Sequence, residues 1–167
     1  FGIIEGEERV REFDVSTYGT QVLLNEWNTS GCLPGEGGEG IAFVPDSFLA
    51  AAGFVDHAGS PYLSQRGMNG LMFVGHQAFG RIYVFDLERG AGTGAFTVVG
   101  EYATQFSEIS ELSFDRSTGL LYVLHDSNFD TIEVLDLSSE PVAGQPACAQ
   151  VSALRKLNTV AEYDLPG

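Results

Sequence analysis

Basic side chains are scarce in this sequence of 167 residues. It holds 8 Lys and Arg residues, of which Lys156 is the one lysine, against 23 Asp and Glu residues, so its formal net charge is −15. A field of this sign repels phosphate backbones, which argues against nucleic-acid binding. The same field attracts cations and also keeps a protein in solution, and the composition leaves both interpretations open.

Long apolar runs are absent as well. No stretch approaches the roughly 20 apolar residues that a membrane-spanning helix requires, so we expect no membrane span. The start of the chain lacks a charged-then-apolar segment with a small-residue cleavage site, so we expect any signal peptide to lie outside this chain.

Cysteine is nearly absent, because Cys32 and Cys148 are the only two and allow at most one internal disulfide. Asn28-Thr29-Ser30 matches the sequon for N-linked glycosylation, a modification of exported proteins. Together these features favour an extracellular or periplasmic location.

What the sequence does contain is an internal repeat. Each copy holds four short apolar segments in the same order. In chain order, the first segment is "GIAF" (40–43) in one copy and "ELSF" (111–114) in the other, and the second is "LMFVGHQAF" (71–79) and "LLYVLHDSN" (120–128). The third is "RIYVFDL" (81–87) and "TIEVLDL" (131–137), and the fourth is "TVVGEY" (97–102) and "NTVAEY" (158–163).

Each segment has the character of a β-strand, since it is rich in Val, Ile, Leu, Phe and Tyr and is bounded by turn residues. The second segment of each copy is apolar on both faces, as expected of a strand that is covered on both sides. Four strands per unit, repeated at intervals of about 60–70 residues, predict an all-β protein built from β-propeller blades. A β-sandwich is the alternative, but it does not predict the same segment order twice.

The N-terminal part continues the pattern. "RVREFDV" (9–15) matches "RIYVFDL", and "VLLNEW" (22–27) matches "TVVGEY". We therefore expect residues 1–29 to form a half blade, 38–104 a whole blade and 107–166 another. About two and a half blades cannot close a ring, so we expect the missing blades to come from the same parent protein or from other chains.

Two insertions interrupt the repeat. Residues 45–70 contain "PDSFLAAAGF", which predicts a short helix with Asp46 as its N-cap and Gly53 as its terminator. The second insertion, 138–153, contains proline and serine and predicts a surface excursion.

"EGIAF" (39–43) followed by "ISELSFDRSTGLLYVLHDSNFDTIEVLDLSS" (109–139) resembles the phytase-like propeller group, which includes the "esterase-like activity of phytase" and SdiA-regulated families. The resemblance covers about residues 36–137. It implies an exported propeller that is often associated with cations. The sequence has no dense aspartate cluster like that of the propeller phytases, and Lys and Arg are sparse, which argues against phytate hydrolysis.

Strand order places the candidate ligands at one end of the predicted blades. The residues expected there are Glu36, Glu39, Glu108, Glu111, Asp126, His76 and His125. Carboxylate oxygens suit calcium, whereas the two histidines with a carboxylate would suit zinc. The competing interpretation is that the histidines are copies of one blade template and that the carboxylates form a solvated acidic surface.

Other recurring acidic residues predict structural roles. Glu26, Glu101 and Glu162 each precede an aromatic residue on an outer strand, and Asp14, Asp86 and Asp136 each lie at a strand end, where we expect them to shape turns or accept hydrogen bonds. The face assignment puts Cys32 and Cys148 at opposite ends of the blades, so it predicts that they do not bond to each other, because the Cα atoms of a disulfide lie within about 7 Å.

Nucleophilic catalysis lacks support, because the sequence has no G-x-S-x-G elbow and neither cysteine lies in an activating context. The glycine-rich "GEGGEG" (35–40) does not match a phosphate-binding loop, because it lacks the Lys-Ser/Thr ending. The sequence predicts an exported propeller that binds a ligand or a cation at its acidic end, and calcium is the candidate cation. A calcium-dependent hydrolase of phosphate or carboxylic esters is the second hypothesis. A structural protein whose blades pack with those of other chains is the third.

Overall fold

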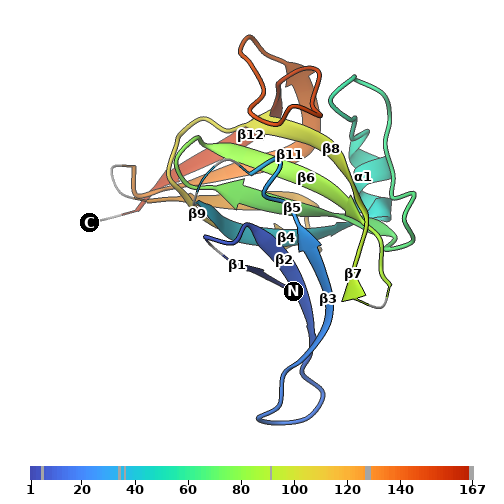
Figure 1. Cartoon of the computed structure of the whole chain (residues 1–167). Helices are drawn as coiled ribbons and strands as arrows, with labels where there is room; N and C mark the ends of the chain where they lie inside the picture. The colour runs from blue at the N-terminus through green and yellow to red at the C-terminus, as the bar shows by residue number, and fades with distance from the viewer. Residues whose placement is uncertain (5, 34, 36, 91, 127–128, 166–167) are drawn as a thin grey trace.

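The computed structural model describes residues 1–4, 6–33, 35, 37–90, 92–126 and 129–165. Its strands form two sheets. The smaller sheet has the order β1-β2-β3-β7, with the bounds β1 Gly2–Ile4, β2 Arg9–Asp14, β3 Val22–Asn28 and β7 Gly92–Thr93. It lies below the larger sheet in Figure 1.

The larger sheet has eight strands in the order β4-β5-β6-β8-β12-β11-β10-β9. Its strands are β4 Gly38–Pro45, β5 Gly70–His76, β6 Arg81–Leu87, β8 Phe96–Ala103, β9 Ile109–Asp115, β10 Leu120–His125, β11 Thr131–Pro141 and β12 Arg155–Asp164. It therefore consists of two antiparallel meanders, β4–β8 and β9–β12. These meet where β8 pairs in parallel with β12 at Tyr102–Ala103.

The all-β prediction is confirmed, and every segment that the sequence predicted as a strand is one. Separate radial blades are not what the structure shows. Because β8 hydrogen-bonds to β12, the two meanders form one mixed sheet that curls until it nearly closes, with β4 packed beside β9. The sequence pattern reports the strand order within each meander, whereas the junction between meanders depends on their packing.

One turn recurs in all three units. The residue before the third strand of each unit has a positive φ, of 49°, 54° and 42° in Glu8, Gly80 and Asp130 respectively. Its carbonyl oxygen accepts a hydrogen bond from the backbone N–H of the residue after the fourth strand, at 3.0, 3.0 and 2.6 Å for Thr29, Thr104 and Leu165. These three turns therefore share one backbone conformation.

The core has two parts, which lie on opposite faces of β5 and β6. One cluster, inside the curled sheet, includes Phe73, Val84 and Leu121. The other lies between the two sheets and includes Trp27 and Met72. All seven residues of β5 are buried, which explains why its sequence is apolar on both faces.

The predicted helix is α1, Asp46–Ala52, and it ends at Gly53 in the left-handed conformation, as expected. Its N-cap is Pro45, and Asp46 is instead the first helical residue. The loop after the helix is held by Asp86, whose carboxylate accepts hydrogen bonds from the Ser64 hydroxyl (2.8 Å) and from Tyr62 (3.1 Å). The pKa of Tyr62 is raised to about 12, mainly by burial and to a lesser extent by the negative charge of Asp86. The hydrogen-bonding role predicted for Asp86 is confirmed.

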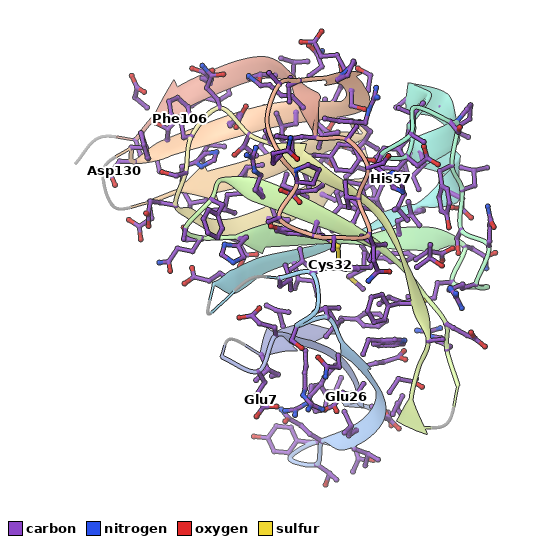
Figure 2. The ribbon with its side chains drawn as sticks, turned by 45° about the horizontal axis from the view of Figure 1, so that its top comes forward. Glu7, Glu26, Cys32, His57, Phe106 and Asp130 are labelled. Atoms are coloured by element: carbon purple, nitrogen blue, oxygen red, sulfur yellow. A yellow bond between two sulfur atoms is a disulfide. The ribbon has the colours of Figure 1, made fainter. Side chains whose placement is uncertain are left out.

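The cysteine prediction is wrong, because Cys32 and Cys148 form a disulfide with their Cα atoms 4.3 Å apart (Figure 2). The reason is the path of residues 142–154, which we call the strap. The strap does not stay at its end of the sheet. It folds back over β8, where the N–H groups of Ala147 (2.7 Å) and Cys148 (3.2 Å) donate to the Glu101 carboxylate.

The strap is also more than a surface excursion. Cys148 is fully buried and Val151 and Leu154 nearly so. On its outer side, Ser152 lies 2.8 Å from the imidazole Nδ1 of His57, in the loop after α1. The strap is thus packed between that loop and the sheet.

Candidate functional site

The connections that carry the predicted site residues meet at the end of the sheet opposite α1, which we call the loop end. A chain of backbone hydrogen bonds runs across it. Gln77 donates to Gly37 O (2.7 Å), Glu108 donates to Gln77 O (2.6 Å), and Asp126 donates to Glu108 O (2.9 Å). We call this chain the loop ladder. It joins four connections that are far apart in the sequence.

His125 lies directly under the loop ladder and is fully buried. Its Nε2 is 3.1 Å from Glu133 Oε2, and its Nδ1 is 2.9 Å from the carbonyl oxygen of Ser107. Phe106 packs edge-on against the ring at 5.4 Å. The imidazole therefore ties β10 to β11 and to the loop before β9.

Glu133 is fully buried too and accepts several hydrogen bonds. Besides His125, its donors are the Thr159 hydroxyl (2.6 Å) and the Gln105 N–H (3.0 Å). Burial disfavours the carboxylate and raises its pKa, but the hydrogen bonds and the charge of His125 outweigh that effect, so the pKa of Glu133 is lower than the usual 4.5.

His76 occupies the equivalent place in the first meander and is also fully buried. Its ring lies 5.0 Å from that of Phe79 and 6.0 Å from that of Tyr83. Gly37 covers it so closely that a Cβ on Gly37 would lie 2.7 Å from His76 Cε1. Both histidines are thus interior residues of the loop end.

The predicted carboxylates surround these histidines without converging. Glu111 and Asp126 are exposed, and Glu39 and Glu108 are half-buried. Glu111 accepts a hydrogen bond from the neighbouring Leu112 N–H (2.9 Å). Glu36 lies outside the described residues. Within the part of the chain that the structure describes, no three His, Cys, Asp or Glu side chains are placed to hold a metal ion.

The three outer-strand glutamates have different surroundings. Glu26 forms ion pairs with Arg9 and with Arg11, the latter at 2.7 Å, and the hydrogen bond from Arg11 lowers the pKa of Glu26. Glu101 is fully buried between Arg81 (3.4 Å) and the strap. Glu162 is exposed. The predicted structural role thus has support at Glu26 and Glu101.

Two residues that support the loop end, Glu133 and Glu8, were not predicted from the sequence. Glu133 stands where the first repeat has Tyr83, so a charged residue at a buried repeat position was the available signal. Glu8 is nearly buried, and its carboxylate accepts a hydrogen bond from the Gly37 N–H (3.2 Å), linking the small sheet to the loop end. The sequence around Glu8 gives no such signal.

A polar depression lies on the parts of β11 and β12 that are distant from the loop end. The ladder between these strands breaks between Leu135 and Ser139, which leaves Asp136 to accept hydrogen bonds from the Ser138 hydroxyl (2.5 Å) and the Asn158 amide (2.7 Å). The depression encloses about 220 Å³ and is lined by Ser138, Ser139, Glu140 and Asn158. The bulge that forms it was not predicted from the sequence.

The fold and the loop end define an all-β protein with an acidic, histidine-backed surface. No family model matches the chain, and neither a curated protein nor a solved structure does. Among the described residues, no helix is long and apolar enough to cross a membrane.

Proposed function

We propose that this chain is part of an exported protein of the β-propeller type that binds a positively charged ligand at its loop end. The loop ladder is the observation that carries the proposal. It fixes the backbones of Glu108 and Asp126 side by side through one hydrogen bond of 2.9 Å. Two carboxylate-bearing residues are thereby held at the surface of a chain whose net charge is −15, which favours cations.

Preorganisation supports a binding role for this end. His76 and His125 are both fully buried beneath the ladder, so the surface rests on packed side chains. A rigid surface binds a ligand without the entropic cost of ordering its own loops.

Calcium does not fit the described residues as a preformed site. A calcium ion takes six to eight oxygen ligands, and no group of three candidate side chains is placed together in the described part of the chain. The proposal therefore assigns no role to a resident metal. The phytase-like resemblance, the calcium-dependent hydrolase and the assembly with other chains stay predictions.

The propeller architecture is supported by the recurring turn at Glu8, Gly80 and Asp130 and by the adjacent first strands of the two meanders, β4 and β9. In a radial arrangement the first strands of the blades line the axis and the fourth strands diverge. A crystal structure tests this directly. The pairing of β8 with β12 joins only two residues of each strand, so in a crystal structure of the chain together with its remaining blades we expect these strands to lie in separate blades. Pairing of β8 with β12 in that assembly would refute the propeller.

Export is supported by the disulfide between Cys32 and Cys148, because disulfides persist in oxidising compartments. The net negative charge also favours solubility outside the cell.

Binding is tested by calorimetric titration with a linear polyamine and, separately, with calcium chloride. The double variant Glu108→Gln/Asp126→Asn should weaken binding about two- to thirtyfold, since each exposed charge pair contributes about 0.2–1 kcal/mol. The matched control is Glu88→Gln/Glu140→Gln, which removes the same amount of charge from two exposed residues. Glu88 follows the end of β6 and Glu140 lies near the end of β11, and both strands run away from the loop end. Equal weakening by both double variants would show that the net charge, and not the loop end, binds the probes.

A further inference from the structure

Asn28 ends β3 on the protein surface and begins a tight turn. Its side-chain oxygen Oδ1 accepts two hydrogen bonds from Ser30, one from the backbone N–H (3.1 Å) and one from the hydroxyl (2.7 Å). Asn28 and Ser30 are the first and third residues of the sequon N-x-S/T. The turn thus joins the two side chains that define an acceptor site for N-linked glycans.

The hydrogen bonds also settle which way the amide of Asn28 points. A backbone N–H only donates, so the atom that faces the Ser30 N–H must be the oxygen. The Nδ2 atom therefore points away from the Ser30 N–H, on a residue that is exposed to solvent. Nδ2 is the atom that carries the sugar in an N-linked glycan.

The turn is anchored on its inner side. Thr29, the middle residue of the sequon, is fully buried, and its hydroxyl and N–H both donate to the Glu8 carbonyl oxygen, at 2.7 and 3.0 Å. The short strand β7 pairs with β3 only at Asn25 and Glu26, so it does not cover Asn28. A bulky group on Nδ2 therefore has solvent around it while the fold beneath stays packed.

From this geometry we propose that Asn28 is an N-glycosylation site. The donor is an oligosaccharide linked to a lipid pyrophosphate. Nδ2 attacks C1 of the first sugar, a bond forms between that carbon and the nitrogen, and the bond from C1 to the pyrophosphate oxygen breaks. The lipid pyrophosphate leaves with the electron pair, and Nδ2 gives up one proton to a base of the transferase. The inference rests on the proposed export, because the donor lies within the secretory route.

The test expresses the chain behind a cleavable signal peptide in a eukaryotic secreting host. Protein is collected from the cells and from the medium. Each sample is treated, in heavy-oxygen water, with a peptide amidase that releases N-glycans, and is then digested to peptides. A modified Asn28 becomes an isotope-labelled aspartate, which mass spectrometry of the peptide detects. The disulfide between Cys32 and Cys148 is read in the same material by peptide mapping without reductant.

Four variants of the chain give the comparison. Asn28→Gln and Ser30→Ala should abolish the label and the mass of the glycan, whereas Ser30→Thr, which keeps the hydroxyl, should retain both. Asn158→Gln is the matched control, because Asn158 is an exposed strand asparagine outside any sequon, and it should leave the label at Asn28 unchanged.

The outcomes separate the two proposals. Secreted, disulfide-bonded protein without a label at Asn28 overturns the glycosylation site and leaves the proposed export standing. Labelled protein that accumulates inside the cell supports the site, because the label requires entry into the secretory route, and it shows that the chain is not released into the medium. A label that survives Ser30→Ala also overturns the inference, because the sequon hydroxyl would then be irrelevant.

Discussion

At the scale of single residues, Glu133 is a carboxylate that is fully buried. A carboxylate without access to water is costly unless donors replace the lost hydration. Here the donors are His125, Thr159 and Gln105. They come from β10, β12 and the loop before β9, so one side chain gathers three parts of the second meander.

Replacing Glu133 with glutamine tests this role. Glu133→Gln should lower the free energy of unfolding by about 1–3 kcal/mol at neutral pH, because hydrogen bonds to a charged group are lost. Urea unfolding followed by circular dichroism measures the difference. Thr159→Val is a useful companion, since it removes one donor and leaves the charge.

The pH dependence follows from the lowered pKa of Glu133. The unfolded chain has the usual value of 4.5 and the folded chain a lower one. The contribution of Glu133 is therefore complete above pH 4.5 and is lost as the pH falls through the folded pKa. The gap in stability between the natural chain and Glu133→Gln should accordingly narrow in acid. A gap that stays constant down to the acid unfolding transition would contradict the assignment.

Gly37 is a second residue with a sharp expectation. Gly37→Ala places a methyl group 2.7 Å from His76 Cε1, and such overpacking should cost about 1–3 kcal/mol. Gly31→Ala is the matched control in the same loop, because nothing lies within 4 Å of its Cβ position. Thermal unfolding of both variants should show a loss for Gly37→Ala alone.

At the scale of elements, the strap and the disulfide join parts of the chain that the sheets do not connect. Cys32 follows the small sheet, and Cys148 lies in the strap between β11 and β12, 116 residues away. The bond therefore restricts a long loop in the unfolded chain.

Removing the disulfide should lower the stability by about 2–5 kcal/mol. Urea unfolding of Cys32→Ala/Cys148→Ala, compared with the natural chain in the presence and absence of reductant, measures this. Reduction should bring the natural chain close to the double variant and leave the variant itself unchanged. If reduction moves the double variant equally, the reductant acts elsewhere.

The strands could be predicted because their signal is local. Apolar residues bounded by turn residues identify β5, β6 and β10 individually, and the repeat identifies their order. The path of the strap could not be predicted, since no periodicity directs Cys148 to Cys32 across β8. The pairing of β8 with β12 spans only two residues in each strand and likewise leaves no mark in the sequence. At the loop end, His125 was predicted from the sequence as a site residue, whereas its partner Glu133 was not.

At the scale of the whole molecule, charge is the dominant feature. With 23 acidic and 8 basic residues, like charges repel one another in the folded chain and oppose its compactness. Ion pairs such as that of Arg11 with Glu26 offset part of this repulsion.

Salt should therefore stabilise the protein. The distance over which charges act falls from about 10 Å at 0.1 M to about 3 Å at 1 M, so the unfolding temperature should rise with sodium chloride and equally with potassium chloride. Differential scanning calorimetry at several concentrations measures this. A falling midpoint would mean that attractive pairs outweigh the repulsion.

The loop ladder is made of main-chain atoms alone. Replacing Gln77 or Glu108 with any residue other than proline changes the side chain that the surface presents to a ligand. The N–H and carbonyl groups that form the ladder stay in place. Alignment by the backbone and recognition by side chains are thereby separated, so new binding preferences can evolve at this end of the molecule. At Glu108, whose φ is 60°, only residues that tolerate the left-handed conformation fit without strain.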